Sequence, residues 1–443
     1  MYVHSVRWLE MLQLLLAVFV LLAGGPGLGT TAAAKAVHLL CFATSWGVTV
    51  WAILVGGVIM FLNLPTHAMG RLRGKVFQAC FALNAACTAA SAAAFAWLHR
   101  PPWPPAERRQ LAVLLVAAGF DLANLLIFTP RTLENAQAAR SSSTLAAENA
   151  RFCVAHGFSA VALIISAAGL FSHFCYLSRK IGQISPKKPT FSIPFSPTTS
   201  FPPSRHLLLV SGRRFPLAAG TLGDQRERER VMGWATRFLA AVCFFAAGVV
   251  FAPDVLLGAR SGGGGGAATA AKVAHLLCFA TSWGAALWAT FIGGIIMFKN
   301  LPRHQFGNLQ GKLFPAYFML ISACAAVSVA AFAYLHPWKT ASTVERYQLG
   351  FLLAALGFDL SNLLVFTPMT IEMMKKRHKI ERDLSIGEEV GWSKNVQVAK
   401  NNPTLAAINK KFGMIHGLSS LANIMSFGSL AMHSWYLASK LEM

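Results

Sequence analysis

A twelve-residue string that occurs twice constrains the fold of this chain more than any other feature. GFDLANLLIFTP at Gly119–Pro130 returns as GFDLSNLLVFTP at Gly357–Pro368. Each copy places an acidic residue, Asp121 or Asp359, near the middle of an apolar run of about twenty residues, which is long enough to cross a bilayer. A charge at that depth costs several kcal/mol unless it is protonated, hydrated or paired, so both acids are candidate functional residues.

Composition places the chain among membrane proteins. Of its 443 residues, 55% are hydrophobic and 13% charged, and the mean hydropathy is +0.51. The net charge of +22 is also compatible with nucleic-acid binding. However, the Lys and Arg residues lie in loops between apolar blocks, as membrane topology requires, and no nucleic-acid-binding motif accompanies them. We therefore expect the lipid bilayer as partner and no nucleic acid, and a homo-oligomer stays open.

The chain carries an internal duplication of a whole domain. The first predicted span, His38–Phe61, recurs at His275–Phe298 with 17 of 24 positions identical. So long a period indicates two copies of a domain rather than a solenoid. Small residues four apart, such as Ala43 and Gly47, recur in the second copy and predict that this span packs closely along one face. The eight cysteines lie in apolar segments without a CxxC pair, so we expect buried thiols.

The fold class predicted is all-α, a multi-pass membrane protein with two homologous four-helix bundles. The other spans are expected near 76–98, 111–129 and 152–176, and near 313–335, 349–367 and 412–436. The residue before a proline is disfavoured in helix, so Thr-Pro predicts the end of the third span. The loops at 63–75 and 300–312 are predicted to be shaped turns, and a histidine there, such as His304, is more often solvated than a ligand.

Segment composition predicts five regions. We assign 1–34 to a signal-peptide-like segment or an extra hydrophobic helix, 35–180 to the first bundle and 181–231 to a disordered Pro/Ser/Arg-rich linker. A second signal-like segment with a Gly-rich stretch occupies 232–271, and the second bundle occupies 272–443. A signal-like segment in mid-chain favours two separate products, through initiation at Met232 or cleavage, over one double-bundle protein.

Charge predicts how the second bundle is oriented. The loops after its first and third spans hold twelve Lys and Arg residues, which predicts that both face the cytoplasm. The second of these loops, 369–411, is longer than its counterpart in the first copy. Its charged stretch favours a solvated helical extension up to about Arg382.

Polar residues at similar depth predict one buried cluster in each bundle. An asparagine follows each acid at i+3, on the same helix face, and three serines fall at a similar depth at a rise of ~1.5 Å per residue. The candidate clusters are Asp121, Asn124, Ser45, Ser91 and Ser166, and Asp359, Asn362, Ser282, Ser328 and Ser426. We expect the acids to be neutral, because desolvation disfavours a carboxylate. Such a cluster fits either a proton- or cation-handling carrier or a helix–helix hydrogen bond, and the small bundle favours the structural reading.

Several longer strings resemble the transmembrane protein 205 family in its plant-like form. They are HLLCFATSWG, NLPxHxxGxLxGKxF and GFDLxNLLxFTPxTxE, and the likeness covers about 38–178 and 275–440. The resemblance implies four-helix integral membrane proteins with a suggested role in membrane trafficking and in tolerance to metal-containing drugs.

The expected function is therefore that of a non-enzymatic protein of the secretory pathway, in an endomembrane or the plasma membrane. The alternative is a small-solute, proton-coupled or metal-ion transporter that uses the Asp–Asn–Ser cluster. No hydrolase, metalloprotease or nucleotide-binding motif occurs, so we expect no enzyme, no cofactor and no metal site.

Overall fold

The computed structural model describes residues 30–99, 101–141, 145–182, 265–391 and 394–443. Helices dominate these ranges and no strand occurs within them, which confirms the all-α prediction. Almost all of the predicted linker and most of both signal-like segments lie outside the described residues. The seven described cysteines are free thiols, and six of them are at least partly buried, whereas Cys153 is exposed.

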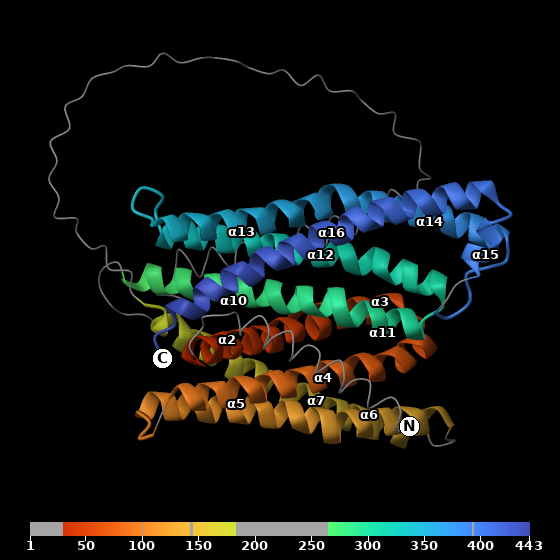
Figure 1. Ribbon diagram of the computed structural model, residues 1–443. Coiled ribbons are helices and arrows are strands. Elements are labelled where there is room, and N and C mark those ends of the chain that lie inside the picture. The colour runs from red at the N-terminus through yellow and green to blue at the C-terminus, as the bar shows by residue number, and fades with distance from the viewer. Residues whose placement is uncertain (1–29, 100, 142–144, 183–264, 392–393) are drawn as a thin grey trace, which may run out of the picture. The chain divides into compact units, whose positions relative to one another are not determined.

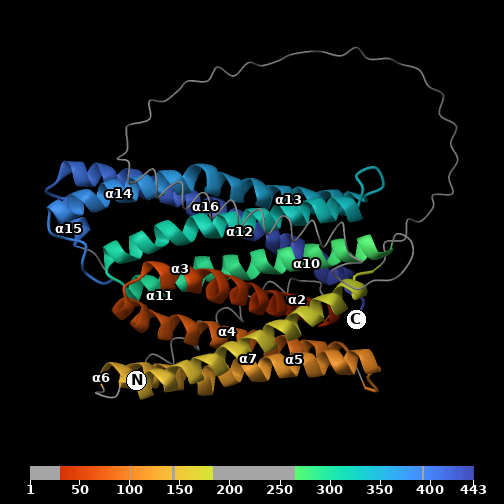
Figure 2. The same cartoon turned by 180° about the vertical axis from the view of Figure 1, so that it is seen from behind.

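The first bundle consists of four long helical runs, each packed on the next (Figure 1). The first two are α2 (Thr30–Val48) with the π-helical segment η1 (Thr49–Val55) and α3 (Gly56–Asn63), then α4 (Thr66–Leu98). The third is α5 (Pro105–Ala123) with the π-helical η2 (Asn124–Phe128) and α6 (Thr129–Ser141), and the fourth is α7 (Leu145–Lys180). Figure 2, from behind, shows α7 crossing α5.

The second bundle repeats this order. Its first two runs are α10 (Gly265–Trp288), η3 (Ala289–Gly293) and α11 (Gly294–Asn300), then α12 (Arg303–Leu335). The third is α13 (Thr343–Ser361), η4 (Asn362–Phe366) and α14 (Thr367–Asp383). The short α15 (Asn395–Ala399) lies in the longer loop before the last run, α16 (Pro403–Lys440). The predicted charged helix up to about Arg382 is thus the end of α14.

Seven helical runs among the described residues are long and apolar enough to cross a membrane. The apolar windows of the first runs are 56% and 72% buried, whereas those of the third runs are 28% and 22% buried. The exposed large apolar side chains of α5, α7, α13 and α16, such as Leu115, Ile164 and Leu353, form outer faces suited to lipid. The first and second runs therefore form the core.

The prediction that a helix ends at each Thr-Pro pair is wrong. Helix continues from η2 into α6 through Pro130, and from η4 into α14 through Pro368. A proline lacks the N–H and crowds the carbonyl four residues earlier, which normally breaks a helix. Here the N–H of Thr129 bonds to Asn124 O, five residues back, so the π turn places Pro130 in the first turn of α6.

The loops at 63–75 and 300–312 are helical over most of their length, contrary to the predicted shaped turns. Only the Leu-Pro pair leaves the helix, because α4 begins at Thr66 and α12 at Arg303. Gly307 allows close helix contact, because a Cβ there would lie 2.6 Å from Cε1 of His378 on α14. His304 is buried rather than solvated, because it bonds to Glu381 on α14.

The two bundles meet through equivalent residues of α2 and α10. Trp46 Nε1 donates to Thr281 Oγ1 at 3.0 Å, and Trp283 Nε1 donates to Thr44 Oγ1 at 3.0 Å. Trp283 and Thr281 occupy the positions of Trp46 and Thr44 in the second copy. An interface in which the same residues exchange contacts is the pattern of a two-fold dimer.

Two further pairs follow the same reciprocal pattern. Gly47 and Gly284 face each other so closely that a Cβ on Gly47 would lie 2.6 Å from the Gly284 Cα. At the helix ends, Lys35 Nζ donates to Leu441 O at 2.6 Å and Lys272 Nζ donates to Ile181 O at 2.9 Å. The small-residue face predicted from sequence is therefore where α2 and α10 pack.

Candidate functional site

Asp121 is completely buried at the end of α5 and has hydroxyl neighbours on α4 and α7. Thr88 Oγ1 donates to Asp121 Oδ2 at 3.1 Å, and Ser45 Oγ lies 2.8 Å from the same threonine hydroxyl. Ser166 also lies against this carboxyl. The other oxygen, Asp121 Oδ1, is buried without a hydrogen-bond partner among the described residues.

The spacing of polar residues on α4 explains this arrangement. Asn84, Thr88 and Ser91 are four and three residues apart, so they share one helix face. Asn84 Nδ2 donates to Thr49 Oγ1 at 2.8 Å, and Ser91 bonds to His38. These side chains form a polar row between α2 and α4 within an otherwise apolar core.

The structure brings only part of the predicted first cluster together. Ser166 lies against the Asp121 carboxyl, and Ser45 is linked to it through the Thr88 hydroxyl. Ser91 is engaged elsewhere, because its hydroxyl lies 2.9 Å from His38 Nδ1. Asn124 is buried at the first residue of η2, and neither polar atom of its side chain has a hydrogen-bond partner among the described residues.

The second bundle keeps the acid but loses its threonine. Asp359 is buried, Ser426 lies against its carboxyl, and Oδ1 again has no partner in the described ranges. Ala325 occupies the position of Thr88, which leaves the Ser282 hydroxyl without a partner there. Two residues of the predicted second cluster do not bond to Asp359. Asn362 Oδ1 accepts from Ser419 Oγ at 2.7 Å, and the Ser328 hydroxyl has no hydrogen-bond partner among the described residues.

A separate polar chain exists in the second bundle and was not predicted. Tyr317 Oη donates to Asn423 Oδ1 at 2.9 Å, and Asn423 Nδ2 donates to Thr290 Oγ1 at 2.7 Å. The equivalent positions in the first bundle hold cysteine, leucine and isoleucine, so nothing in the duplication points to this chain. The two copies have therefore diverged within their cores.

Each bundle also buries a pair of histidines that sequence reasoning missed. His38 Nε2 lies 3.0 Å from His173 Nε2, and His275 Nε2 lies 2.9 Å from His433 Nε2. All four imidazoles are at most 2% exposed. A sequence signal for these pairs was available, because in both copies one histidine lies at the start of the first span and another near the end of the fourth. In an up-and-down four-helix bundle these two helix ends lie on the same side of the membrane.

The outer nitrogens of the first pair determine its protonation. His38 Nδ1 lies 2.9 Å from Ser91 O, and His173 Nδ1 lies 3.0 Å from Gln110 Oε1. If both Nδ1 atoms donate to these oxygens, the two facing Nε2 atoms are both acceptors, and the contact requires an added proton between them. Two other arrangements satisfy the same contacts. If the Gln110 amide is turned so that its nitrogen donates to His173 Nδ1, or if the Ser91 hydroxyl donates to His38 Nδ1, that histidine carries its ring proton on Nε2 instead. The pair therefore has closely related states that differ by the position or number of protons.

The second pair has the same environment. His275 Nδ1 lies 3.2 Å from Ser328 O, and His433 Nδ1 lies 3.0 Å from Gln348 Oε1. Charged groups lie near the pairs at the helix ends: Lys180 Nζ is 2.9 Å from Glu107 Oε1 in the first bundle. In the second, His336 Nδ1 is 3.2 Å from Glu345 Oε1, and burial lowers the pKa of His336 despite that carboxylate.

Comparison with known proteins identifies relatives of both bundles. A family described as a domain of unknown function, DUF4149, matches residues 40–141 and 277–379. Transmembrane protein 205 of Danio rerio is 32% identical over 171 residues, which cover 38% of this chain and 91% of that protein. No solved structure matches the chain. Two matched domains and a relative covered over nearly its whole length show that this chain belongs to the transmembrane protein 205 family.

Proposed function

We propose that the protein is a proton-coupled membrane carrier in which each bundle provides one protonatable site. One observation carries the proposal: a membrane-buried carboxyl in each bundle, Asp121 or Asp359, has an oxygen that no described residue satisfies. An acid that only held helices together would gain stability from bonds at both oxygens, because polar side chains in membranes hydrogen-bond across helices. An oxygen left open is available to a proton, a water molecule or a transported cation.

The histidine pair supports proton movement in particular. In the first bundle the polar row on α4 links Thr88, which bonds to Asp121, and Ser91, which bonds to His38, across less than one helical turn. Hydroxyls and imidazoles can each donate and accept, so a proton can be passed along such groups. The row thus connects the acid near the membrane centre with the histidines nearer one surface.

The two bundles are expected to differ in this activity. Ala325 interrupts the row in the second bundle, because it replaces the threonine that bonds to the acid in the first. We therefore propose that proton movement depends more strongly on Asp121 than on Asp359. The trafficking and drug-tolerance roles implied by the family resemblance would be cellular consequences of such a carrier, and the absence of enzymatic activity stays a prediction.

Flux measurement in liposomes tests the proposal. The full chain is reconstituted with a pH-sensitive dye inside, and proton entry is followed after an imposed pH gradient. We expect D121N to remove most of the protein-dependent flux, D359N to remove less, and the control D383N, at an exposed aspartate at the end of α14, to leave it unchanged.

Folding of each variant is checked separately by helical content and size-exclusion profile. Equal flux through the wild type and a folded D121N/D359N double variant would refute the carrier. The acids would then have a structural role, and the double variant would differ from the wild type only in stability.

A further inference from the structure

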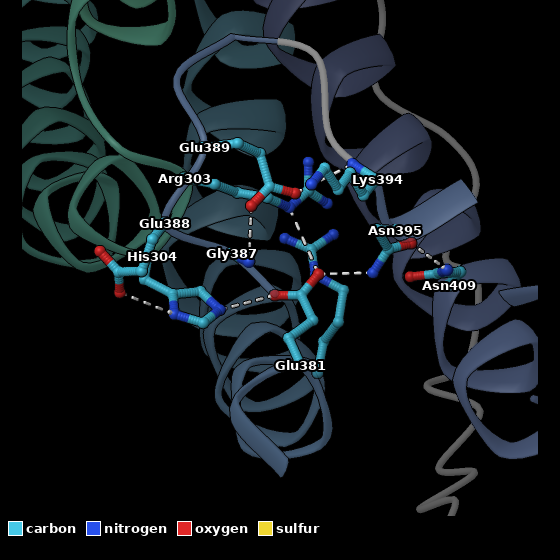
Figure 3. A network of polar contacts seen from close by, with 10 residues as sticks. Arg303, His304, Glu381, Gly387, Glu388, Glu389, Lys394, Asn395 and Asn409 are labelled. Carbon is cyan, nitrogen blue, oxygen red and sulfur yellow. Dashed lines mark hydrogen bonds and ion pairs between the residues drawn. The ribbon is translucent and has the colours of Figure 1, made fainter. Parts of the chain in front are cut away.

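A second polar cluster lies at the end of the second bundle, where α12 begins and α14 ends. His304 Nε2 is 2.9 Å from Glu381 Oε2, and the rings of His304 and His378 are 4.4 Å apart. All three side chains are buried, and Glu381 is completely so. Figure 3 shows the His304 ring directed at the Glu381 carboxylate.

We propose that His304, His378 and Glu381 bind a divalent transition-metal ion of the zinc class. One donor atom from each lies within 4.8 Å of the other two. Two imidazole nitrogens and one carboxylate oxygen form a donor set that zinc and its neighbours in the first transition row bind. The ion would take the place of the proton that joins His304 Nε2 to Glu381, and His304 would then carry its one ring proton on Nδ1, which faces Glu388 Oε1 at 3.8 Å. The proton displaced from Nε2 would move to Nδ1 where that nitrogen is free, and would otherwise be released to solvent.

The state of His378 is an independent observation that points to a ligand. Its Nε2 is buried and has no hydrogen-bond partner among the described residues. A buried polar atom left unsatisfied costs about 1–3 kcal/mol, so a native structure rarely keeps one without a reason. The α12 backbone lies close to this ring at Gly307, whose hypothetical Cβ would be 2.8 Å from the same nitrogen.

The remaining contacts of Glu381 orient its carboxylate. Oε1 faces Arg303 Nε at 3.3 Å and Arg377 Nε at 3.6 Å, and it accepts from Asn395 Nδ2. These partners hold one oxygen and leave Oε2 directed at the histidines, as outer partners do around metal ligands. The arginine charges also weaken cation binding. We therefore expect R303Q to bind the ion more tightly than the wild type.

The loop insertion that distinguishes the second bundle closes this site. Backbone bonds join Arg303 N to Glu389 O at 3.0 Å and His304 N to Gly387 O at 3.1 Å. Gly387 has a φ of +109°, and any side chain there would overlap the His304 ring. The first bundle keeps a histidine, His67, at the position of His304, but Arg140 and Ser143 stand at the positions of His378 and Glu381. Two of the three donors therefore occur only in the bundle that carries the insertion.

Metal titration of the full chain in detergent tests the site. After treatment with a chelator, Co²⁺ is added and its visible absorption followed, with Zn²⁺ as competitor. We expect one ion per chain with nitrogen and oxygen ligation, loss of at least tenfold in affinity in H378N, and no change in the control H156N. Asparagine retains a polar side chain but cannot reach the position of Nε2.

A second measurement does not depend on any variant. Binding to the folded state raises the melting temperature as the ion concentration rises above the dissociation constant. A wild-type melting temperature that does not change with Zn²⁺, or Co²⁺ binding by folded H378N equal to that of the wild type, would overturn the proposal. Because neither readout is proton flux, the carrier proposal can fail while this one stands.

Discussion

Replacing Gly47 by alanine tests the contact between the bundles where it is tightest. The new Cβ would lie 2.5 Å from Ala280 O and 2.6 Å from Gly284 Cα, and both are backbone atoms that no side-chain rotation can move away. Helices α2 and α10 must therefore separate. Overpacking of this kind costs about 1–3 kcal/mol. Separation also stretches the two Trp–Thr hydrogen bonds, each worth about 1 kcal/mol.

Gly119 provides a matched control within the same type of span. A Cβ at Gly119 meets no atom within 4 Å. Alanine is favoured over glycine in a helix by about 1 kcal/mol. The same substitution is therefore expected to destabilise the pairing of bundles at Gly47 and to be neutral or stabilising at Gly119.

The assay uses the full chain with a protease site inserted near residue 200. After cleavage in mild detergent, the two halves are expected to elute together from size-exclusion chromatography, because the contacts of α2 and α10 do not need the covalent link. Increasing amounts of a denaturing detergent should separate the halves of G47A before those of the wild type or G119A. Separation of G47A and G119A at the same detergent fraction would refute the reasoning.

Three further outcomes are expected. H173F leaves His38 Nε2 buried without its partner, so it should destabilise the protein by about 1–3 kcal/mol in thermal melts, whereas H156F, at an exposed position, should have little effect. Glycosylation acceptors should be modified after Met443 and not in the 375–400 loop, and modification of the loop alone would contradict the charge-based orientation. An antibody to the C-terminus should detect a band near half of 47.7 kDa in native tissue if the chain yields two products, and one full-length band would contradict that hypothesis.

The fold could be predicted because its signals are local or repeated. Apolar runs of span length, the duplicated first span and the Ala43–Gly47 spacing each depend on a single segment, and the structure agrees with all three. The ends of the third runs could not be predicted from the same kind of signal. A proline rule treats Pro130 as a stop, whereas one π turn before it is enough for the helix to continue.

The sequence predicted the candidate site only for residues whose contacts follow from their depth in the membrane. Ser45 and Ser166 lie near Asp121 because consecutive spans bring equal depths together. Ser91 lies at a similar depth, but its hydroxyl faces His38, a choice set by helix rotation rather than by depth.

The His304–Glu381 contact joins residues 77 positions apart and depends on how the loop insertion folds back. Similarly, the histidine pairs require knowing which helix ends are neighbours. The positions of the histidines at the ends of the first and fourth spans give this information only when they are combined with an up-and-down order of the helices, whereas no pattern within one segment reveals the His304–Glu381 contact.

Infrared spectroscopy of the membrane-embedded protein measures the central property most directly, namely whether the two intramembrane acids carry protons. At neutral pH we expect a carbonyl stretch from protonated carboxyl groups that disappears in D121N/D359N and persists in D383N. A spectrum in which the double variant loses only carboxylate bands would contradict the account, because it would show that both acids are ionised in the membrane.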